Sequence, residues 1–208
     1  GIDVERFSPE RPLEREIHFE LPDSHAFVAG MITRIRQTRR LDVPLKAIQL
    51  LNDTHHHLRL LLVGRGREGA FESVVDRPAS EMGIRDRIIP AGYCQGDELV
   101  AALRAMDVLL YPMPGTDKTC RTVREALAAG VPVIAPQIGF LPQLIQDNVN
   151  GRLVDLQPEA FAQALKDLMD SPEDVRRLSQ GALESAQGFN PAIQAEKTLQ
   201  LYSRLMPA

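Results

Sequence analysis

Short apolar runs alternate with amphipathic stretches along most of this chain. Several of these runs lack polar alternation, which is typical of parallel strands buried on both faces. The runs that predict strands are residues 26–32, 58–63, 86–92, 107–111, 131–135 and 152–154. Between them, apolar residues recur at helical spacing. The predicted helices are residues 41–51, 71–82, 98–106, 119–129, 159–169, 172–186 and 191–205.

This order of strands and helices predicts a single α/β domain over residues 1–208, with a doubly wound, Rossmann-like parallel sheet. No hairpin-rich region interrupts the alternation. Residues 9–24 carry prolines and charges, so we expect a linker-like entry to the domain there. Residues 190–206 hold the last predicted helix.

Ligands of doubly wound sheets bind outside the carboxyl ends of the strands. Four loops with suitable side chains follow predicted strands, at residues 34–40, 64–69, 93–94 and 117–125. Because these loops lie at one edge of the sheet, the pattern predicts a single site for an anionic ligand.

The composition is that of an ordinary globular protein, with 44% hydrophobic and 25% charged residues. A net charge of −4 does not suggest a nucleic-acid-binding protein. No apolar run approaches the ~20 residues that cross a membrane. Two cysteines, Cys94 and Cys120, make no disulfide framework. They fit a reducing compartment, so a cytoplasmic location is expected.

The loop after the first predicted strand is rich in arginine. Its arginines are Arg34, Arg36, Arg39 and Arg40. One interpretation is a solvated basic loop. The other is an anion clamp, because guanidinium groups bind phosphate oxygens in pairs.

Residues Gly64 to Gly69 form a G-x-G-x-x-G motif. A dinucleotide site needs this motif after the first strand and an acidic residue at the end of the next strand. Here the motif follows the second predicted strand, and Asp86 precedes the third instead of ending a strand. The position therefore argues against a dinucleotide site.

Three adjacent histidines, His55, His56 and His57, precede the second predicted strand. Adjacent side chains in a turn do not all converge on one ion, and no cysteine or aspartate frames them. They therefore predict a solvated loop, and no metal site is expected.

The helix predicted at residues 119–129 begins just past a strand, where free N–H groups and the helix dipole favour an anion. Gly130 is placed to end this helix. Within it, Thr122 and Glu125 match the S/T-x-x-E capping box, which the spacing alone favours. Alternatively, Glu125 acts together with Asp117, and both carboxylates accept hydrogen bonds from sugar or ribose hydroxyls.

The segment Glu125-Ala-Leu-Ala-Ala-Gly-Val-Pro-Val-Ile134 is similar to the signature of retaining GT-B glycosyltransferases of group 1, the GT4-like group. That signature contains E-x7-E, and Asp117 stands where its first acid is expected. Gly1-Ile-Asp-x-x-x-Phe-x-Pro9 resembles the segment that opens the second half of such enzymes. The resemblance covers nearly the whole chain.

Three further loops resemble those of the same family. Gly30 matches the glycine of the family's G-R-x4-K-G loop, and Arg36 falls where its lysine is expected. Gly64-Arg-Gly66 resembles the V-G-x-G loop beside the nucleotide. Gly92-Tyr93-Cys94 resembles the loop whose backbone meets the nucleobase.

The chain departs from the family pattern at several positions. Asp117-Lys-Thr-Cys120 replaces the usual Glu-Gly-Phe-Gly. Met31 stands where an arginine is expected, so Arg34, Arg39 or Arg40 would supply that charge. Phe140 and Gln143 replace a glycine and an acid of the G-G-x-x-E loop.

The resemblance implies the donor-binding half of a bacterial-type, hexosyltransferase-like enzyme that uses a nucleotide-diphospho-sugar and no metal or other cofactor. The implied catalytic residues are Asp117, which contacts the sugar, and Glu125, which binds ribose hydroxyls. Diphosphate contacts are implied for Arg36 and for the N–H groups near Arg121 and Thr122. The full set of implied donor-binding residues is Gly30, Arg34, Arg36, Gly64, Gly66, Tyr93, Cys94, Thr119, Arg121 and Thr122.

The resemblance also implies a partner domain. The acceptor site belongs to an N-terminal half that is not part of these residues, and the last helix crosses back to it. Such enzymes can contact a membrane peripherally through that half. Two alternatives stay open: a non-catalytic nucleotide-binding module, and a flavodoxin-like or dinucleotide-binding domain.

Overall fold

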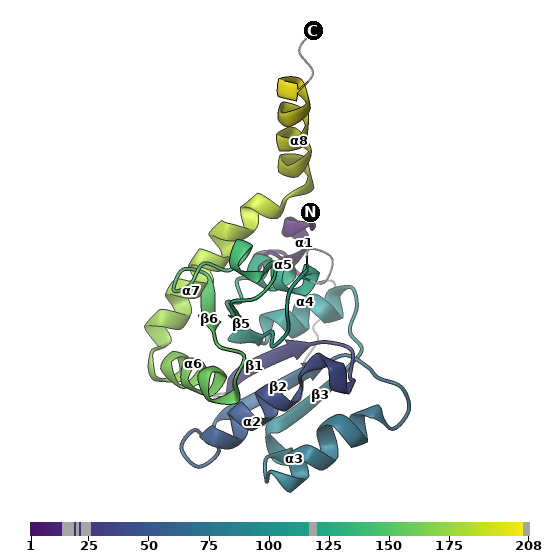
Figure 1. The fold of residues 1–208 in the computed structure, drawn as a ribbon, viewed down its shortest axis with the longest axis vertical. Helices are drawn as coiled ribbons and strands as arrows, with labels where there is room; N and C mark the ends of the chain where they lie inside the picture. The colour runs from purple at the N-terminus through teal and green to yellow at the C-terminus, as the bar shows by residue number, and fades with distance from the viewer. Residues whose placement is uncertain (14–18, 20, 22–25, 117–119, 206–208) are drawn as a thin grey trace.

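The fold is a parallel six-stranded sheet covered by helices on both faces (Figure 1). It is seen in a computed structural model that describes residues 1–13, 19, 21, 26–116 and 120–205. The strands are β1 Phe27–Ile32, β2 Leu58–Val63, β3 Ile88–Gly92, β4 Val108–Leu110, β5 Val133–Pro136 and β6 Gly151–Val154. Their order across the sheet is β3-β2-β1-β4-β5-β6.

The sheet is doubly wound about β1. β1 pairs with β2 on one side and with β4 on the other, and all described strand pairs are parallel. Strands β2 and β3 follow β1 on one side, and β4 is then placed on the other side of β1. The predicted α/β class and parallel sheet are confirmed. The reversal of winding at β1 also marks where such sheets bind ligands.

The helices separate the core into two layers. Their bounds are α1 Val4–Phe7, α2 Asp42–Leu51, α3 Arg77–Glu81, α4 Asp97–Arg104, α5 Arg121–Ala128, α6 Pro158–Asp170, α7 Pro172–Ala186 and α8 Pro191–Leu205. One buried cluster joins α1, α4 and α5 to the sheet. The other joins α2, α3 and α6 to the opposite face. The central strands β1, β2, β4 and β5 therefore have a covering layer on both sides, whereas the edge strands β3 and β6 are less buried.

Short helical turns account for two differences from the predicted boundaries, in the helix predicted at residues 71–82 and at the start of the strand predicted at residues 86–92. A π-helical turn, Glu72–Asp76, precedes α3, so the helix predicted at residues 71–82 consists of two parts. Single 3₁₀ turns lie at Gln37–Arg39, Arg85–Arg87, Leu141–Gln143 and Gln187–Phe189. The predicted helices at residues 172–186 and 191–205 are confirmed to the residue.

The short helix α1 is an addition that the sequence pattern did not predict. Val4 and Phe7 are buried in the layer that contains α5, and Asp3 caps the helix by accepting from N–H of Arg6 at 3.1 Å. N–H of Ile2 also donates to the carbonyl oxygen of Phe189 at 3.1 Å. This first segment is therefore anchored to the body of the domain.

The last helix, α8, extends away from the rest of the molecule (Figure 1). Leu199 and Tyr202 on this helix are 67% and 59% exposed. Within the described residues, no helix combines the length and apolar character needed to cross a bilayer.

Candidate functional site

A cavity of about 1000 Å³ opens at the carboxyl ends of β1, β2, β3 and β4. Residues from the loops after these strands line it, together with the start of α5. The structure thus brings together segments that are far apart in the sequence, such as those of Arg34 and Glu125. They meet because the strands that precede them are neighbours in the sheet. Described residues from all four loops line one cavity, so the predicted convergence is confirmed apart from residues 117–119, which lie outside the described part of the chain.

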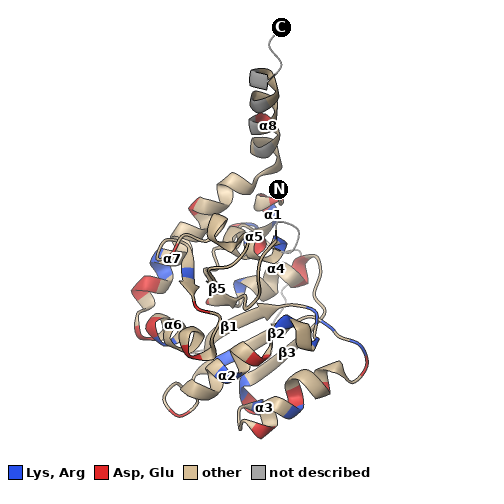
Figure 2. Ribbon diagram, in the orientation of Figure 1, with Lys and Arg blue, Asp and Glu red and all other residues tan. Residues whose placement is uncertain are grey.

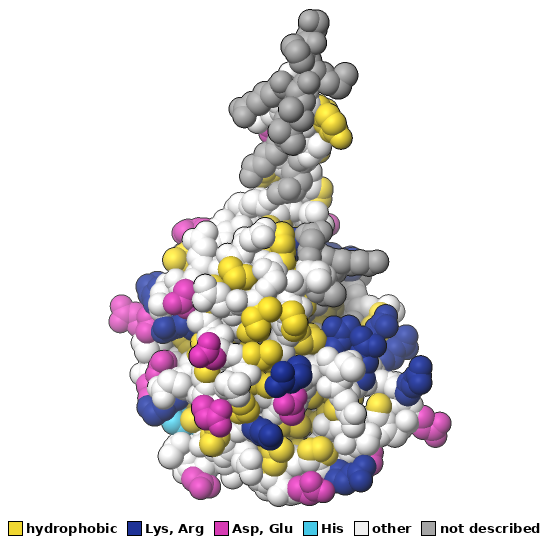
Figure 3. Space-filling model, viewed as in Figure 1, with side chains coloured by type: hydrophobic (Ala, Val, Ile, Leu, Met, Phe, Trp, Pro, Cys, Tyr) yellow, Lys and Arg dark blue, Asp and Glu magenta, His cyan; other side chains and the backbone are white. Residues whose placement is uncertain are grey.

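Arginines dominate the charge of this cavity. They are Arg6, Arg34, Arg36, Arg39, Arg65, Arg67 and Arg121, whereas Glu125 is the only carboxylate among the described residues that line it. Figure 2 shows basic residues on the loop that leads into α3, and Figure 3 shows Lys and Arg side chains gathered on that side of the molecule. A cavity so basic in a chain of net charge −4 fits an anionic ligand.

Glu125 lies on α5 and is the buried acid of the cavity. Its carboxylate accepts a hydrogen bond from Nε of Arg121 at 2.8 Å, and its side chain is 7% exposed. Burial raises the pKa of Glu125, while the hydrogen bond and charge of Arg121, and then the charge of Arg6, act to lower it. The buried oxygens remain strong acceptors when ionised.

The predicted capping box is wrong. α5 begins at Arg121 with Cys120 as its N-cap, so Thr122 is the second helical residue and not the cap. Glu125 is the fifth helical residue, where its carboxylate bonds to the side chain of Arg121 instead of a backbone N–H. A capping box needs the acid at the third helical position. Asp117 and Thr119 lie outside the described residues.

The arginines of the loop after β1 separate into two groups. Arg34, Arg36 and Arg39 line the cavity. Arg40 does not line it and forms an ion pair with Asp42 at 3.1 Å. The anion-clamp interpretation therefore applies to three of the four.

Arg39 holds the most enclosed position of these arginines. Its Nη1 lies 3.5 Å from Sδ of Met113, in the segment that leads from β4 toward α5. Its Nε is buried and has no hydrogen-bond partner within the described part of the chain. A buried donor without a partner at a cavity wall is a place for a ligand acceptor. The sequence named Arg39 only as a substitute for a missing charge.

Gly30 does not line the cavity, although the resemblance placed it among the donor-binding residues. It lies inside β1, where a side chain would collide with Met106. Its role in this structure is to let the segment after α4 pack close to the sheet.

Gly64 and Gly66 hold two loops against each other. A side chain at Gly64, whose φ is 142°, would collide with the carbonyl oxygen of Thr33, and one at Gly66 would lie 2.6 Å from that of Ile35. N–H of Ile35 donates to the carbonyl oxygen of Arg65 at 3.0 Å in the same contact. Asp86 precedes β3, as predicted. The glycines thus permit close backbone packing after β2, which is not where a dinucleotide site lies.

Tyr93 and Cys94 follow β3 and line the same cavity. The ring of Tyr93 is 55% exposed, and the guanidinium carbon of Arg65 lies 4.5 Å from its centre. Cys94 is buried, and its Sγ donates to the carbonyl oxygen of Ala91 at 3.6 Å. Burial, and then the charge of Glu98, raise the pKa of its thiol. A raised pKa keeps the thiol protonated and argues for a structural cysteine.

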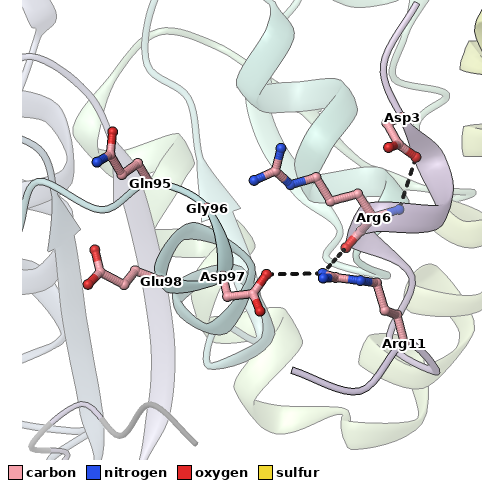
Figure 4. Close-up of a pocket in the computed structure, with 7 residues that line it drawn as sticks. All are labelled: Asp3, Arg6, Arg11, Gln95, Gly96, Asp97 and Glu98. Carbon is pink, nitrogen blue, oxygen red and sulfur yellow. Dashed lines mark hydrogen bonds and ion pairs between the residues drawn. The ribbon is translucent and has the colours of Figure 1, made fainter. Parts of the chain in front are cut away.

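A second hollow lies beside the first and is shown in Figure 4. Its volume is about 950 Å³, and it shares Arg6, Gln95 and Gly96 with the main cavity. Arg11 spans it, with Nη1 3.1 Å from a carboxylate oxygen of Asp97. No sequence pattern indicated Arg6 or Gln95, because packing between segments distant in the chain places them at these cavities.

The three histidines are not equivalent. His55 is buried, with Nδ1 2.8 Å from Oγ1 of Thr54 and Nε2 3.5 Å from Asp170, whereas His56 and His57 are exposed. The prediction of a solvated loop is therefore wrong for His55. Across residues 1–13, 19, 21, 26–116 and 120–205, no group of three or more His, Cys, Asp or Glu is arranged to hold a metal ion.

The architecture is that of a doubly wound α/β domain, with a basic cavity at the carboxyl edge of its parallel sheet. Residues 14–185 match the family model described as glycosyl transferases group 1. The chain belongs to this family.

Relatives and solved structures agree with this assignment. The D-inositol 3-phosphate glycosyltransferase of Corynebacterium glutamicum is 32% identical over 98% of this chain and 50% of its own length. The enzyme of the same name from Saccharomonospora viridis is 33% identical over all of this chain and 49% of its own. The chain thus spans about half the length of these relatives.

Two crystal structures show the same fold. The C-terminal domain of LpcC, a group 1 protein of Francisella tularensis, matches with a TM-score of 0.74 and 21% identity, over 90% of this chain and 97% of that domain. HepE of Anabaena, solved in complex with UDP, matches with a TM-score of 0.79 and 19% identity, over 98% of this chain and 56% of HepE. The expected likeness to one half of a GT-B glycosyltransferase is confirmed.

Proposed function

We propose that this chain binds the nucleotide-diphospho-sugar donor of a retaining glycosyltransferase. The observation that carries the proposal is the basic cavity at the point of the sheet where the winding reverses. Among the described residues that line this cavity, the only carboxylate is that of the buried Glu125 on α5. An ordinary nucleotide-diphospho-sugar presents both an anionic diphosphate and neutral hydroxyls. This cavity offers guanidinium donors for the first and a carboxylate acceptor for the second.

The diphosphate would lie between the β1 loop and the beginning of α5. Arg39 reaches toward this place through its contact with Met113, and Arg34 and Arg36 line the adjacent wall. The first N–H groups of α5, near Arg121 and Thr122, have no acceptors within a helix, and the helix dipole favours negative charge there. Together these donors would neutralise the charge that develops on the diphosphate as it leaves the sugar.

Glu125 would bind the ribose. Its buried carboxylate already accepts one hydrogen bond from Arg121, which leaves oxygen lone pairs for two ribose hydroxyls. Burial raises the pKa of Glu125, and the hydrogen bond and charge of Arg121 partly oppose this shift by favouring the ionised form that accepts such bonds. Asp117, eight positions before Glu125 in the sequence, would contact the transferred sugar.

The acceptor would bind to a second domain that faces this cavity. The half-length match to the glycosyltransferases of Corynebacterium and Saccharomonospora supports such a domain, as does the exposed apolar surface of α8. We therefore expect these 208 residues to bind a donor without transferring its sugar. Neutralisation by arginines and a helix terminus would make a metal cofactor unnecessary.

Calorimetric titration with UDP, GDP, ADP, FMN and NAD tests the proposal. One nucleoside diphosphate should bind at micromolar concentration, and its sugar-bearing form should bind at the same site in competition. Binding of FMN or NAD instead, or of none of the five, would exclude a donor site. Sugar transfer by these residues alone would contradict the need for a second domain.

A further inference from the structure

Two exposed side chains that line the cavity, Arg65 and Tyr93, are in contact with each other. The guanidinium carbon of Arg65, in the loop after β2, is 4.5 Å from the ring centre of Tyr93, in the loop after β3. Both side chains are exposed and both line the cavity. A ligand in the cavity can therefore contact a guanidinium group that already lies over an aromatic ring.

The backbone holds this pair in place. N–H of Gly64, the residue before Arg65, donates at 2.7 Å to the carbonyl oxygen of Gly92, the residue before Tyr93. The carbonyl oxygen of Arg65 accepts from N–H of Ile35 at 3.0 Å. Because these backbone groups are hydrogen-bonded to neighbouring loops, the backbone positions of Arg65 and Tyr93 are fixed relative to each other. The first half of the G-x-G-x-x-G motif thus fixes the backbone position of Arg65.

The position of the pair suggests which part of a nucleotide it meets. Adjacent strands are about 4.8 Å apart, so the end of β2 lies roughly 10 Å from that of β4 and the end of β3 roughly 14 Å. The proposed diphosphate contacts are at β1, β4 and α5, on the other side of the cavity. A nucleoside diphosphate that extends along the strand ends would bring its base to Arg65 and Tyr93.

We propose that Arg65 is a specificity-determining residue of the donor site, where its guanidinium plane stacks against the nucleobase while Tyr93 supports the opposite face of that plane. This inference rests on the proposed donor function. The guanidinium group is flat and weakly hydrated, so both of its faces can stack on π-systems. Stacking favours a ligand with a planar ring, but it does not distinguish one base from another by its hydrogen-bond donors and acceptors. The pair would therefore distinguish nucleotides from base-free phosphates and sugar phosphates.

Two substitutions at Arg65 separate stacking from charge. Arg65→Ala removes both the plane and the charge, whereas Arg65→Lys keeps the charge and removes the plane. The probe is the nucleoside diphosphate that binds tightest among UDP, GDP and ADP, measured by calorimetry. Stacking predicts that both variants bind it about tenfold more weakly than the unaltered protein. Full recovery of affinity in Arg65→Lys would show that only charge matters and would overturn the proposal.

Arg67→Ala is the matched control. Arg67 belongs to the same loop, is also exposed and also lines the cavity, so its loss removes an equal charge from the same region. Charge effects weaken with added salt, but a stacking contact does not depend on screening. The loss in Arg65→Ala should therefore persist at high NaCl, while any loss in Arg67→Ala should shrink. Equal salt-sensitive losses in the two variants would identify Arg65 as one more phosphate contact.

Tyr93→Leu tests the supporting ring. Leucine keeps apolar bulk but removes the π-face that orients Arg65, so affinity should fall by a smaller factor than in Arg65→Ala. The double variant should bind no more weakly than Arg65→Ala, because the two residues act as one layer. Fully additive losses would show that the residues act separately.

Two outcomes distinguish failure of the donor function from failure of the stacking role. If the unaltered protein binds no nucleoside diphosphate, the donor function itself fails. If it binds one and Arg65→Ala binds it equally well, only the stacking role fails.

Discussion

A carboxylate oxygen of Glu125 lies 2.8 Å from Nε of Arg121, one helical turn earlier on α5. The acid is 7% exposed and the arginine 73%, so the pair joins the buried floor of the cavity to its solvent-exposed wall. Its geometry excludes a backbone cap for Glu125 and leaves the carboxylate beside the space that a ligand would occupy. A charged acceptor so placed should affect binding more than folding.

Glu125→Gln should weaken binding of the nucleoside diphosphate by roughly one to two orders of magnitude, because charged hydrogen bonds contribute ~1.5–3 kcal/mol. The melting temperature should change little, since Gln keeps the shape and still accepts from Arg121. Calorimetry and thermal melting measure the two effects. Glu68→Gln removes an exposed carboxylate from a nearby loop and is the control. Equal affinities of the unaltered protein and Glu125→Gln would leave the ribose contact unassigned.

The pH dependence of stability should also reveal Glu125. Burial raises its pKa above the ordinary value of 4.5, although Arg121 opposes the shift. The folded protein therefore binds this proton more tightly than the unfolded chain does, and stability decreases as pH rises through the folded pKa. The contribution is fully present below the pKa of the unfolded chain.

Urea unfolding at a series of pH values measures this effect. The free energy of unfolding of the unaltered protein, minus that of Glu125→Gln, should fall as pH rises above about 4.5. Other titrating groups cancel in this difference because both proteins share them. A difference that increases with pH would mean that Arg121 outweighs burial.

Arg39→Gln should weaken binding of a nucleoside diphosphate by about ten- to a hundredfold, because its buried Nε loses a charge-assisted bond to phosphate. Arg40→Gln removes the same charge one residue later, where the side chain pairs with Asp42 outside the cavity. That control should lower affinity only slightly. Binding measurements at equal ionic strength compare the two. A larger effect of Arg40→Gln would place the phosphate on the other side of the loop.

Gly64→Ala should destabilise the domain by at least about 2 kcal/mol, since it combines an unfavourable φ with a collision against the loop after β1. Gly69→Ala is the matched control, because Gly69 also has a positive φ of 69° but no atoms near its absent side chain. It should cost only about 1 kcal/mol. Denaturant unfolding gives both values. Similar costs would mean that the contact between the two loops relaxes freely.

Much of the fold could be predicted from the sequence, because the burial of residues within a helix or strand follows the local periodicity of hydrophobic positions. The run at residues 58–63 became β2 without change, and the helices at residues 172–186 and 191–205 were also predicted to the residue. A run without polar alternation requires covering layers on both faces, and the two core clusters supply them. Loops after parallel strands share one edge, so the location of the cavity was predictable too.

Short or aperiodic features escaped prediction. The four residues of α1 are too few for a periodic signal, yet they bring Arg6 to the cavity. The spacing of Thr122 and Glu125 suggested a cap at Thr122, but the N-cap is Cys120 and α5 begins two residues earlier than that cap requires. The spacing of two residues does not show which residue is the first of a helix, because contacts outside the helix also affect where it begins.

The sequence alone determined the class of fold, the edge of the sheet at which the cavity lies and the excess of arginine there. Only the tertiary structure decided which arginines enter the cavity. Arg39 and Arg40 are adjacent and chemically identical, but one lies against Met113 and the other pairs with Asp42. The first contact spans seventy-four positions of the chain. Side-chain direction in a loop is set by such distant neighbours, and hydrophobic periodicity carries no information about them.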